Sequence, residues 1–118
     1  MTYEELEKVF LGKAGAWLDY PFGQQAAVFK VGSKMFGFIA WDDDPMWMNL
    51  KCDPDDAMAL REMFAAVTPG YHMSKRHWNS VKIDGTIPEP MLLDMVESSY
   101  QLVFKSLKKA DRIAILGG

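Results

Sequence analysis

The sequence predicts an α+β domain, in which an antiparallel sheet of about five strands has helices packed on one face. Three observations predict it. Short runs rich in β-branched and aromatic residues are separated by turn residues. Segments with a helical apolar period begin at residues that favour helix N-termini. The order helix, three strands, helix, two strands, helix continues without a repeat or linker, so we expect one domain over residues 1–118.

The first two predicted helices have clear start signals. Thr2 and Glu5 form a capping box, and the helix that they open is expected to end near Gly15. Asp53 suits the N-cap of the second helix, because its carboxylate can accept a hydrogen bond from a backbone N–H of the first turn. Pro54 suits the first helical position, where a backbone N–H has no partner within the helix and its absence costs nothing. These two helices are expected before and after the first three strands.

The last predicted helix begins at Pro88 or Pro90 and continues to Leu107, which makes it the longest. Its apolar residues recur every three or four positions, the spacing of one helix face. The tail that follows it shows the pattern for no more than a half-turn of helix, over residues 111–116.

The strands are predicted from runs that combine β propensity with turn residues at both ends. They are expected at Ala26–Val31, Lys34–Trp41, Met46–Lys51, from Val67 onward, and at His77–Ile83. Gly32 and Ser33 predict a tight hairpin between the first two runs. The segment 15–25 is expected to be an aromatic loop, because Pro21 and Gly23 interrupt regular structure.

Alternation in the last predicted strand sorts its side chains into two faces. One face carries Trp78, Ser80 and Lys82, and the other carries Asn79, Val81 and Ile83. We expect Trp78 to fill the space between the sheet and the last helix near Tyr100, because a bulky ring with one N–H donor suits a buried edge. At least one of His72 and His77 is expected to bond a backbone carbonyl or Asp84.

Composition limits the classes of protein that the chain can belong to. Its 49% hydrophobic and 25% charged residues are typical of a globular protein, and no apolar run approaches the roughly 20 residues that span a bilayer. The N-terminal residues lack the pattern of a secretory signal. A single cysteine, Cys52, excludes an internal disulfide. We therefore expect a cytoplasmic protein that does not interact with membranes.

Basic residues are concentrated in one segment of an acidic chain. Residues 67–83 carry three basic and no acidic side chains, a net charge of +3, whereas the whole chain has a net charge of −3. The same segment contains two histidines, a tyrosine and a tryptophan. A basic and aromatic segment of this kind is typical of an anion-binding or nucleic-acid-binding surface, and also of a hairpin with solvated cations.

If the segment binds nucleic acid, cations contact phosphates and polar side chains read bases. The expected phosphate contacts are Lys30, Lys34, Lys75, Arg76 and Lys82. The base readers would be His77 or Asn79. The alternative is that the tip of this hairpin is a solvated turn and that Trp78 belongs to the core.

A long motif is similar to that of a known family. The motif consists of His72, Met73, Lys75, His77, Trp78, Val81, Ile83, Asp84 and Gly85, followed by Ser99, Tyr100, Leu102 and Val103. It resembles the MmcQ/YjbR family, with Ile83 where a leucine is usual. The resemblance implies a frataxin-like (CyaY-like) fold. It also implies DNA binding through a "double wing", with double-stranded DNA as the partner and the turn 31–34 as the second wing.

Nothing in the sequence predicts an enzyme, a metal site or a cofactor. Cys52 has no activating neighbours in the sequence, and the glycines form no phosphate-binding loop. The alternative to nucleic-acid binding is a protein- or small-ligand-binding module. The net charge of −3, the excess of methionine and the aromatic residues Trp17, Tyr20 and Phe22 favour it. A negative surface with an apolar cleft beside Trp17 and Trp78 would distinguish this alternative from DNA binding, which a continuous positive stripe would favour.

Overall fold

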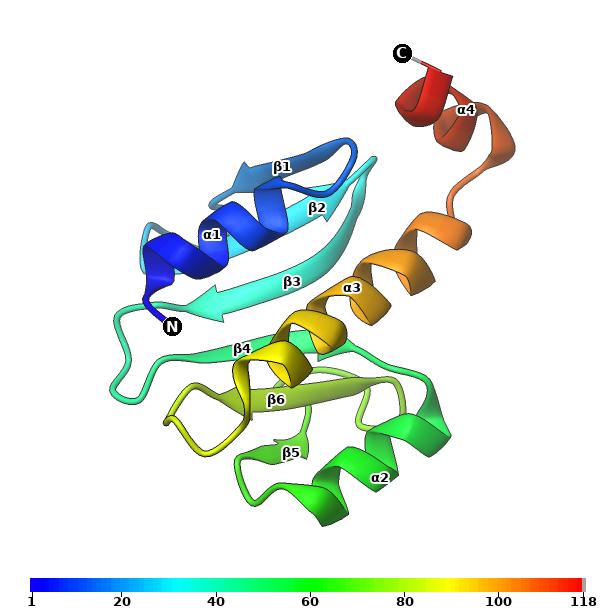
Figure 1. Cartoon of the computed structure of the whole chain (residues 1–118). Coiled ribbons are helices and arrows are strands. Elements are labelled where there is room, and N and C mark those ends of the chain that lie inside the picture. Colours follow the sequence, from blue (N-terminus) through cyan, green and yellow to red (C-terminus); the bar gives the residue numbers. More distant parts are fainter. Residues whose placement is uncertain (118) are drawn as a thin grey trace.

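The computed structural model describes residues 1–117 and contains four helices and six strands (Figure 1). The helices are α1 (Tyr3–Leu11), α2 (Pro54–Met63), α3 (Glu89–Lys105) and α4 (Lys109–Gly117). The strands are β1 (Ala16–Asp19), β2 (Ala26–Val31), β3 (Lys34–Ala40), β4 (Trp47–Lys51), β5 (Val67–Pro69) and β6 (Trp78–Lys82). The capping box of Thr2 and Glu5 and the N-cap at Asp53 are both formed, as predicted.

All six strands lie in one sheet in the order β1-β2-β3-β4-β6-β5, and every neighbouring pair is antiparallel. The predicted α+β class is confirmed, with six strands rather than about five. The additional strand is β1, in the segment that was expected to be a loop. Pro21 and Gly23 follow β1, so they limit this edge strand to four residues without preventing it.

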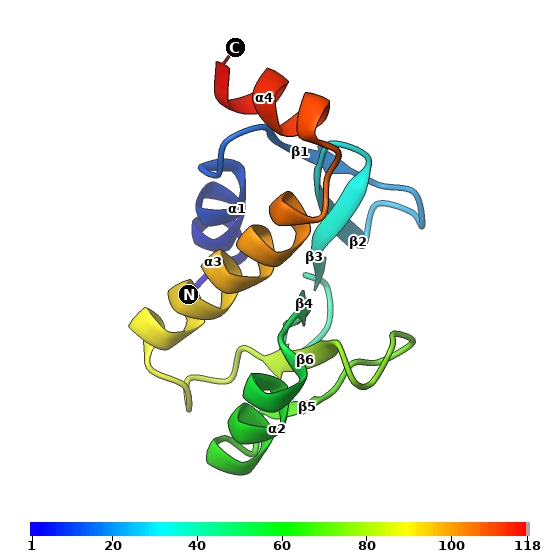
Figure 2. The same cartoon turned by 90° about the vertical axis from the view of Figure 1, so that its right-hand side faces the viewer.

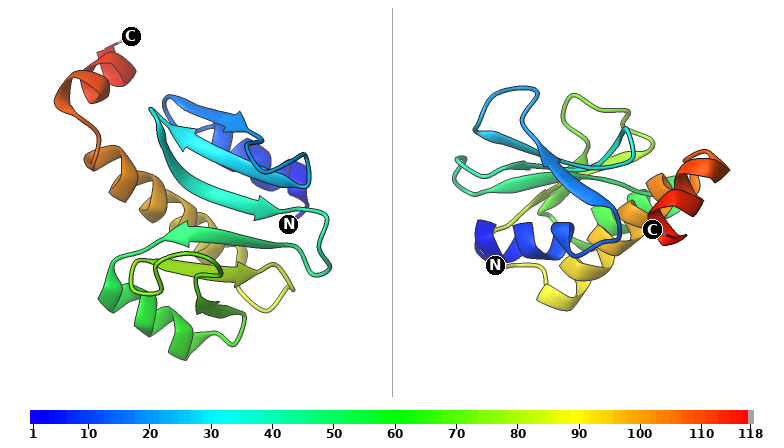
Figure 3. Two further views of the ribbon diagram at one scale, coloured as in Figure 1. Left: turned by 180° about the vertical axis from the view of Figure 1, so that it is seen from behind. Right: turned by 90° about the horizontal axis from the view of Figure 1, so that it is seen from above.

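The helices α1, α2 and α3 pack on one face of the sheet, as predicted (Figures 2 and 3). The longest helix is α3, which crosses β3 and β4, while α2 lies along β5. The core between the layers consists of strand side chains that point toward the helices and of the apolar faces of α1 and α3. Its members include Leu6, Phe10, Phe29, Phe36, Ile39, Met48, Leu50, Val81, Val96, Tyr100 and Val103.

Aromatic rings connect the helix layer to the sheet. Phe10 of α1 stacks on Phe29 of β2 with ring centroids 4.6 Å apart, and Phe36 of β3 meets Tyr100 of α3 edge-on at 5.3 Å. Phe36 is the extra residue of a β-bulge in the β2–β3 pair. Gly37 follows it, and a Cβ at this position would lie 2.1 Å from the Phe10 ring. A residue with a side chain would therefore displace α1.

Two helical segments differ from the prediction. Helix α1 ends at Leu11 rather than near Gly15. The tail forms a complete helix, α4, rather than a half-turn. Ile115 holds α4 against the rest of the chain, because its side chain packs over Gly15. The opposite side of α4 leaves Ile113 and Leu116 exposed.

Candidate nucleic-acid interface

We call the face of the sheet opposite to α1, α2 and α3 the open face, because no helix among residues 1–117 covers it (Figure 2). The β1–β2 loop, 20–25, and the β5–β6 loop, 70–77, project from this side at opposite edges of the sheet (Figures 2 and 3). Strand register and side-chain alternation place a set of large and polar side chains on it. They include Trp17, Asp19, Lys30, Phe38, Trp47, Asn49, Lys51, Trp78, Ser80 and Lys82.

Aromatic side chains form a row across the open face. The rings of Phe38 and Trp47 have centroids 5.5 Å apart, and Trp47 meets Tyr71 edge-on at 5.8 Å. At the other side of the sheet, Lys30 Nζ lies 5.1 Å from the centre of the Trp17 ring. Phe38 and Trp47 are half-buried, whereas Trp17 and Tyr71 are exposed. Accessible aromatic rings with cations beside them are the usual elements of a surface on which unpaired bases stack.

Hydrogen bonds hold three of the indole rings in place. Trp17 Nε1 donates to the Gly32 carbonyl at 2.9 Å, and Trp47 Nε1 donates to the Asp43 carboxylate at 2.6 Å. Trp41 follows β3 and meets Tyr3 of α1 rather than the open face, and its Nε1 donates to a carbonyl of the β1–β2 loop at 2.7 Å. Trp17 and Trp41 remain 43% and 39% exposed. The polar atom of each ring is satisfied, so its apolar surface is available and little conformational freedom is lost on binding.

The β5–β6 loop, 70–77, is fastened to the open face by a pair of buried polar side chains, and we call it the basic loop. Tyr71 N–H donates to the Ser80 hydroxyl at 2.9 Å, and the Asn49 side-chain amide donates to the Tyr71 carbonyl at 3.1 Å. The Ser80 hydroxyl donates in turn to Asn49 Oδ1. Buried polar groups that satisfy one another in this way fix a single loop position.

A second set of bonds holds the basic loop from the helix side. Arg61 of α2 donates through Nε to the Asn79 side chain at 2.7 Å and through Nη2 to the Lys75 carbonyl. Cys52 N–H donates to the His77 carbonyl at 2.8 Å. The basic loop is therefore bonded to two strands and a helix, and it is preorganised for any contact that it makes.

Three of the five predicted phosphate contacts already have partners. Lys30 Nζ bonds the Asp19 carboxylate at 2.8 Å, and this bond lowers the pKa of that carboxyl. Lys34 Nζ bonds the C-cap carbonyl of α3 at 3.1 Å, where a cation is favourable. Lys75 Nζ bonds the Gly70 carbonyl. Each ammonium keeps further N–H donors, so these bonds orient the lysines without excluding an anion.

The remaining predicted contacts are more accessible. Arg76, His77 and Lys82 are exposed, and no hydrogen bond or salt bridge within residues 1–117 occupies their side chains. Arg76 and His77 lie in the basic loop, and Lys82 lies on the open face at the end of β6. These three side chains are therefore the most available to a bound anion.

Asn79 does not lie where a base edge can reach it. It is 2% exposed and lies on the helix-facing side of β6, opposite Leu50. Its side chain accepts a bond from Arg61 and donates to the Ala57 carbonyl at 3.3 Å. The strand alternation that brings Val81 into the core also turns Asn79 inward, so its role is structural and the prediction of base reading is wrong.

Trp78 does not occupy the predicted place between the sheet and α3. It pairs with Lys51 on the open face and is half-buried, whereas Tyr100 packs on the other side of the sheet. Its Cβ lies where Gly70 passes, and a Cβ on Gly70 would come within 2.7 Å of it. The predicted alternation is correct, but Val81 fills the inward position that was assigned to Trp78.

The other motif residues lie at the surface. His72 and His77 are exposed, and within residues 1–117 neither imidazole bonds a carbonyl or Asp84, contrary to the prediction. Asp84 instead accepts bonds from the Thr86 hydroxyl at 2.6 Å and N–H at 3.0 Å, which lowers the pKa of its carboxyl. Gly85 follows with a φ of 83°, a conformation that glycine adopts without strain.

Charge is divided between the two sides of the molecule. The helices α1–α3, with Lys13 and Asp53, carry ten acidic and four basic side chains. The strands and their loops carry six basic and five acidic side chains, and four of these acids, 42–44 and Asp84, lie at one end of the sheet. Four cations from three places on the chain gather at the opposite end: Lys34, Lys51, and the neighbours Lys75 and Arg76. The turn 31–34 and the basic loop therefore share one basic end.

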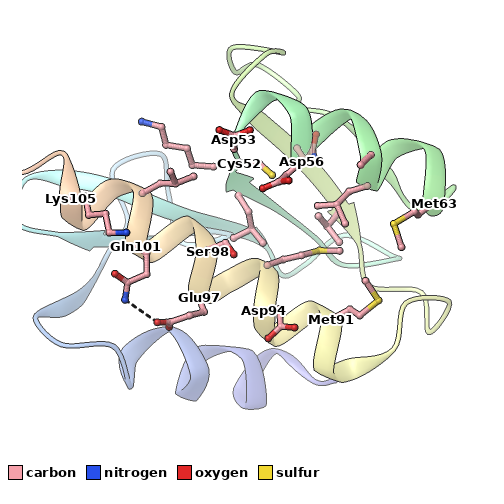
Figure 4. A pocket seen from close by; sticks show the side chains of 18 residues that line it. Cys52, Asp53, Asp56, Met63, Met91, Asp94, Glu97, Ser98, Gln101 and Lys105 are labelled. Atoms are coloured by element: carbon pink, nitrogen blue, oxygen red, sulfur yellow. Dashed lines mark hydrogen bonds between the residues drawn. The ribbon is translucent and has the colours of Figure 1, made fainter.

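A groove of about 540 Å³ lies on the helix side, between α2 and α3 (Figure 4). Apolar side chains of β4, β6 and the two helices line it, and Asp56 and Asp94 lie at its rim. The cleft that would favour a protein- or small-ligand-binding module was named beside Trp17 and Trp78, which are on the open face. The groove lies on the other side of the sheet and is therefore not that cleft.

The groove also contains the one cysteine of the chain, Cys52. Burial raises the pKa of this thiol to about 11, the reverse of the shift that activates a catalytic cysteine. Among residues 1–117, no three His, Cys, Asp or Glu side chains are grouped so that they could bind a metal ion. No helix in the same range combines the length and hydropathy that crossing a bilayer requires.

Comparison with known proteins matches most of the chain to one family model. The model described as YjbR matches residues 11–102. Among curated proteins, YbdF of Escherichia coli O157:H7 is 36% identical over 86% of this chain and 83% of its own length. YjbR of Escherichia coli K12 is 30% identical over 95% of both chains. Both relatives are named as uncharacterized proteins.

Solved structures share the fold. The crystal structure of Deinococcus radiodurans protein DR2400, with the family-model domain DUF419, aligns with a TM-score of 0.91 and 33% sequence identity. The alignment covers 97% of this chain and 87% of that one. A crystal structure of a Pseudomonas syringae protein aligns with a TM-score of 0.75 and 23% identity, over 87% of this chain and 99% of that one.

Proposed function

The chain belongs to the YjbR family, and we propose that it binds nucleic acid with the open face of its sheet and the basic loop. Unpaired bases stack on the aromatic row between Trp17 and Tyr71. Arg76 and Lys82 contact the phosphates, while Lys30 and Lys51 neutralise the strand along the face. The proposed binding residues are therefore side chains that contribute little to the hydrophobic core.

The observation that supports the proposal most strongly is the aromatic row on the open face, in which Trp17 and Tyr71 are exposed and the indole N–H groups of Trp17 and Trp47 are already bonded. A folded domain normally buries such rings, and exposed aromatic patches mark binding surfaces. Stacking contributes roughly 1–3 kcal/mol per base, so two or three rings are enough for a measurable affinity. The net charge of −3 opposes long-range attraction, and binding is therefore expected to depend on the local cations and on low salt.

Duplex DNA is the second candidate ligand, because the double-wing prediction assigns it the same basic loop and the turn 31–34. The basic loop and the turn 31–34 lie at the same basic end of the sheet, and this position supports contact with the phosphates of a duplex. The burial of Asn79 removes one of the two predicted base readers and leaves His77. The flat rings of the open face can stack on bases only if these are unpaired. We therefore rank single-stranded nucleic acid before the duplex.

We also propose that the protein is a binding module rather than an enzyme. The raised pKa keeps the Cys52 thiol protonated at neutral pH, and a protonated thiol is a poor nucleophile. The exposed histidines, His72 and His77, have no bonded carboxylate or hydroxyl partner among residues 1–117. A bonded partner of that kind is what positions a general base.

A fluorescence anisotropy titration tests the proposal. A labelled single strand and its duplex are titrated at low salt, and the single strand is expected to bind more tightly. Neutralisation of four phosphates by Arg76, Lys82, Lys30 and Lys51 predicts a slope of roughly −3 for log affinity against log salt with a single strand. Trp17→Ala and Arg76→Glu are each expected to weaken binding by roughly 5–20-fold, the effect of about 1–2 kcal/mol.

Lys8→Glu is the matched control, because Lys8 is exposed on α1 and the substitution makes the same change of charge away from the open face. It is expected to leave the affinity almost unchanged. Absence of binding by the wild type at low salt contradicts the proposal. Equal weakening by Lys8→Glu and Arg76→Glu also contradicts it, since net charge alone would then control the interaction.

A further inference from the structure

We propose that two copies of this chain associate, with α4 of each copy seated in the groove between α2 and α3 of the other. The inference uses the helix side and the C-terminal helix. It is therefore independent of the nucleic-acid proposal, which concerns the open face.

The groove has the composition of a helix-binding surface. Leu60 and Met63 of α2 and Met91 of α3 line it, and Met63 is 60% exposed. Methionine side chains adapt to the shape of an apolar partner. The groove runs beside α2, whose ten residues span about 15 Å, a length that suits a short helix.

Carboxylates from both helices line the rim of this apolar floor and outnumber its two cations, Lys51 and Lys105. Asp53 and Asp56 come from the start of α2, and Asp94 comes from α3 on the other side (Figure 4). No salt bridge within residues 1–117 pairs these three groups, whereas the neighbouring Glu97 is paired with Lys13 at 2.6 Å. An apolar floor with unpaired carboxylates at its rim favours a partner that is apolar and cationic.

Helix α4 has this chemistry. Ile113 and Leu116 are 58% and 70% exposed, and they lie on the same side of the helix as Lys109 and Arg112. Together with Phe104 they form a shallow apolar surface with a basic margin. The nine residues of α4 span about 14 Å, which matches the length of α2. An exposed isoleucine and leucine on so short a helix indicate a missing partner.

The partner groove belongs to a second copy because α4 is fixed on its own chain. Ile115 packs over Gly15, and Arg112 Nη1 donates to the Lys105 carbonyl at 3.1 Å. These contacts hold α4 beyond the C-terminal end of α3 (Figure 1). Ile113 and Leu116 remain exposed there. If each copy donates its α4 to the other, the two equivalent contacts close a twofold dimer.

Sedimentation equilibrium over a range of protein concentrations tests the association. The weight-average mass of the wild type is expected to rise toward twice the 13.4 kDa monomer mass. Lys109→Glu with Arg112→Glu reverses the charge of α4, and Asp56→Lys with Asp94→Lys reverses that of the groove. Because Arg112→Glu also removes the bond to the Lys105 carbonyl, recovery of association in a mixture of the two variants separates the effect of charge from the loss of this bond. Each double variant is expected to weaken association by at least about tenfold, because like charges then meet across the contact.

Mixing the two double variants gives the sharpest result. In a mixed pair, the basic α4 of one variant meets an unchanged acidic groove, and the acidic α4 of the other meets a basic groove. The mixture is therefore expected to associate although neither variant does so alone. Circular dichroism checks that both variants keep the wild-type fold.

Glu4→Lys with Asp42→Lys is the control, because these exposed acids lie outside the groove and the change of charge is the same. This control is expected to associate like the wild type. A wild type that stays monomeric at millimolar concentration overturns the proposal. So does a groove variant that associates normally, since α4 would then pair with another surface, and so does a mixture that fails to associate.

Discussion

The two faces of the sheet are built from alternate residues of the same strands, yet they differ in composition and in exposure. In β4, Met48 is fully buried beneath the helices, while its neighbour Trp47 lies on the open face and bonds Asp43. The helix-facing side packs aliphatic residues and phenylalanine into one core. The open face carries tryptophan, lysine and fixed polar side chains and remains accessible.

The difference indicates that stability and binding are assigned to opposite faces. A side chain in the core fills space that no other group can fill, so its loss costs free energy of folding. An exposed ring with a bonded N–H contributes little to folding and leaves its surface free for a ligand. Substitutions on the two faces are therefore expected to have separable effects on unfolding and on binding.

The largest expected effect is that of Phe36→Ala. Phe36 is fully buried against Phe10 and Tyr100, so its truncation is expected to lower the free energy of unfolding by about 3–5 kcal/mol. Trp17→Ala on the open face is the comparison, with an expected loss of about 1 kcal/mol or less. Urea unfolding measures both. Similar losses for the two variants would contradict the division between the faces.

Asn79→Ala is expected to come next, with a loss of roughly 2–3 kcal/mol. The substitution removes the acceptor of Arg61 Nε and leaves this charged group with an unmade bond in a half-buried site. Because Arg61 also bonds the Lys75 carbonyl, amides of the basic loop are expected to exchange faster with deuterium. Unchanged stability combined with weaker nucleic-acid binding would instead restore Asn79 as a base reader.

Ser99→Ala tests a polar contact inside the core. The buried Ser99 hydroxyl donates to the Phe36 carbonyl at 2.6 Å and accepts from the Lys51 N–H at 2.8 Å, joining α3 to β3 and β4. Its removal is expected to cost roughly 1–2 kcal/mol of stability and to leave nucleic-acid binding unchanged. Ser98→Ala, on the exposed side of α3, is expected to unfold within about 0.5 kcal/mol of the wild type.

The smallest effect concerns pH and Cys52. Its pKa is about 11 in the folded chain, compared with the ordinary value of 9.0. The unfolded chain therefore loses this proton first, so the contribution to stability is constant below pH 9 and declines as the pH rises from 9 to 11. At pH 8, alkylation of the folded protein is expected to be about 100-fold slower than that of a free cysteine. An ordinary rate in the folded state would show that the thiol is exposed.

The sequence predicts most of the fold because strong local signals and the tertiary structure agree. Caps at Thr2 and Asp53 and the hairpin at Gly32 lie at their predicted positions. Strand β1 and helix α4 were not predicted, because both depend on tertiary contacts. The four residues of β1 are stabilised by pairing with β2, and α4 is stabilised by Ile115 against Gly15.

The binding surface could be predicted only in part. The basic loop was identified from its charge, which is a local property of the sequence. The residues that fix it were missed, because Asn49, Ser80 and Arg61 come from three separate elements. The aromatic row was missed for the same reason, since register alone brings Phe38 and Trp47 together. A polar asparagine within the apolar β4 run was the one sequence signal for this network.

The most direct test of the open face is a map of amide chemical shifts recorded while a single-stranded oligonucleotide is added at low salt. The shifts of strands β1–β4 and β6 and of the basic loop are expected to change, with the indole N–H of Trp47 among the largest changes. Amides of α1, α2 and the buried side of α3 are expected to stay in place. Changes confined to these helices, or no changes at saturating oligonucleotide, would contradict the assignment of the open face to nucleic-acid binding.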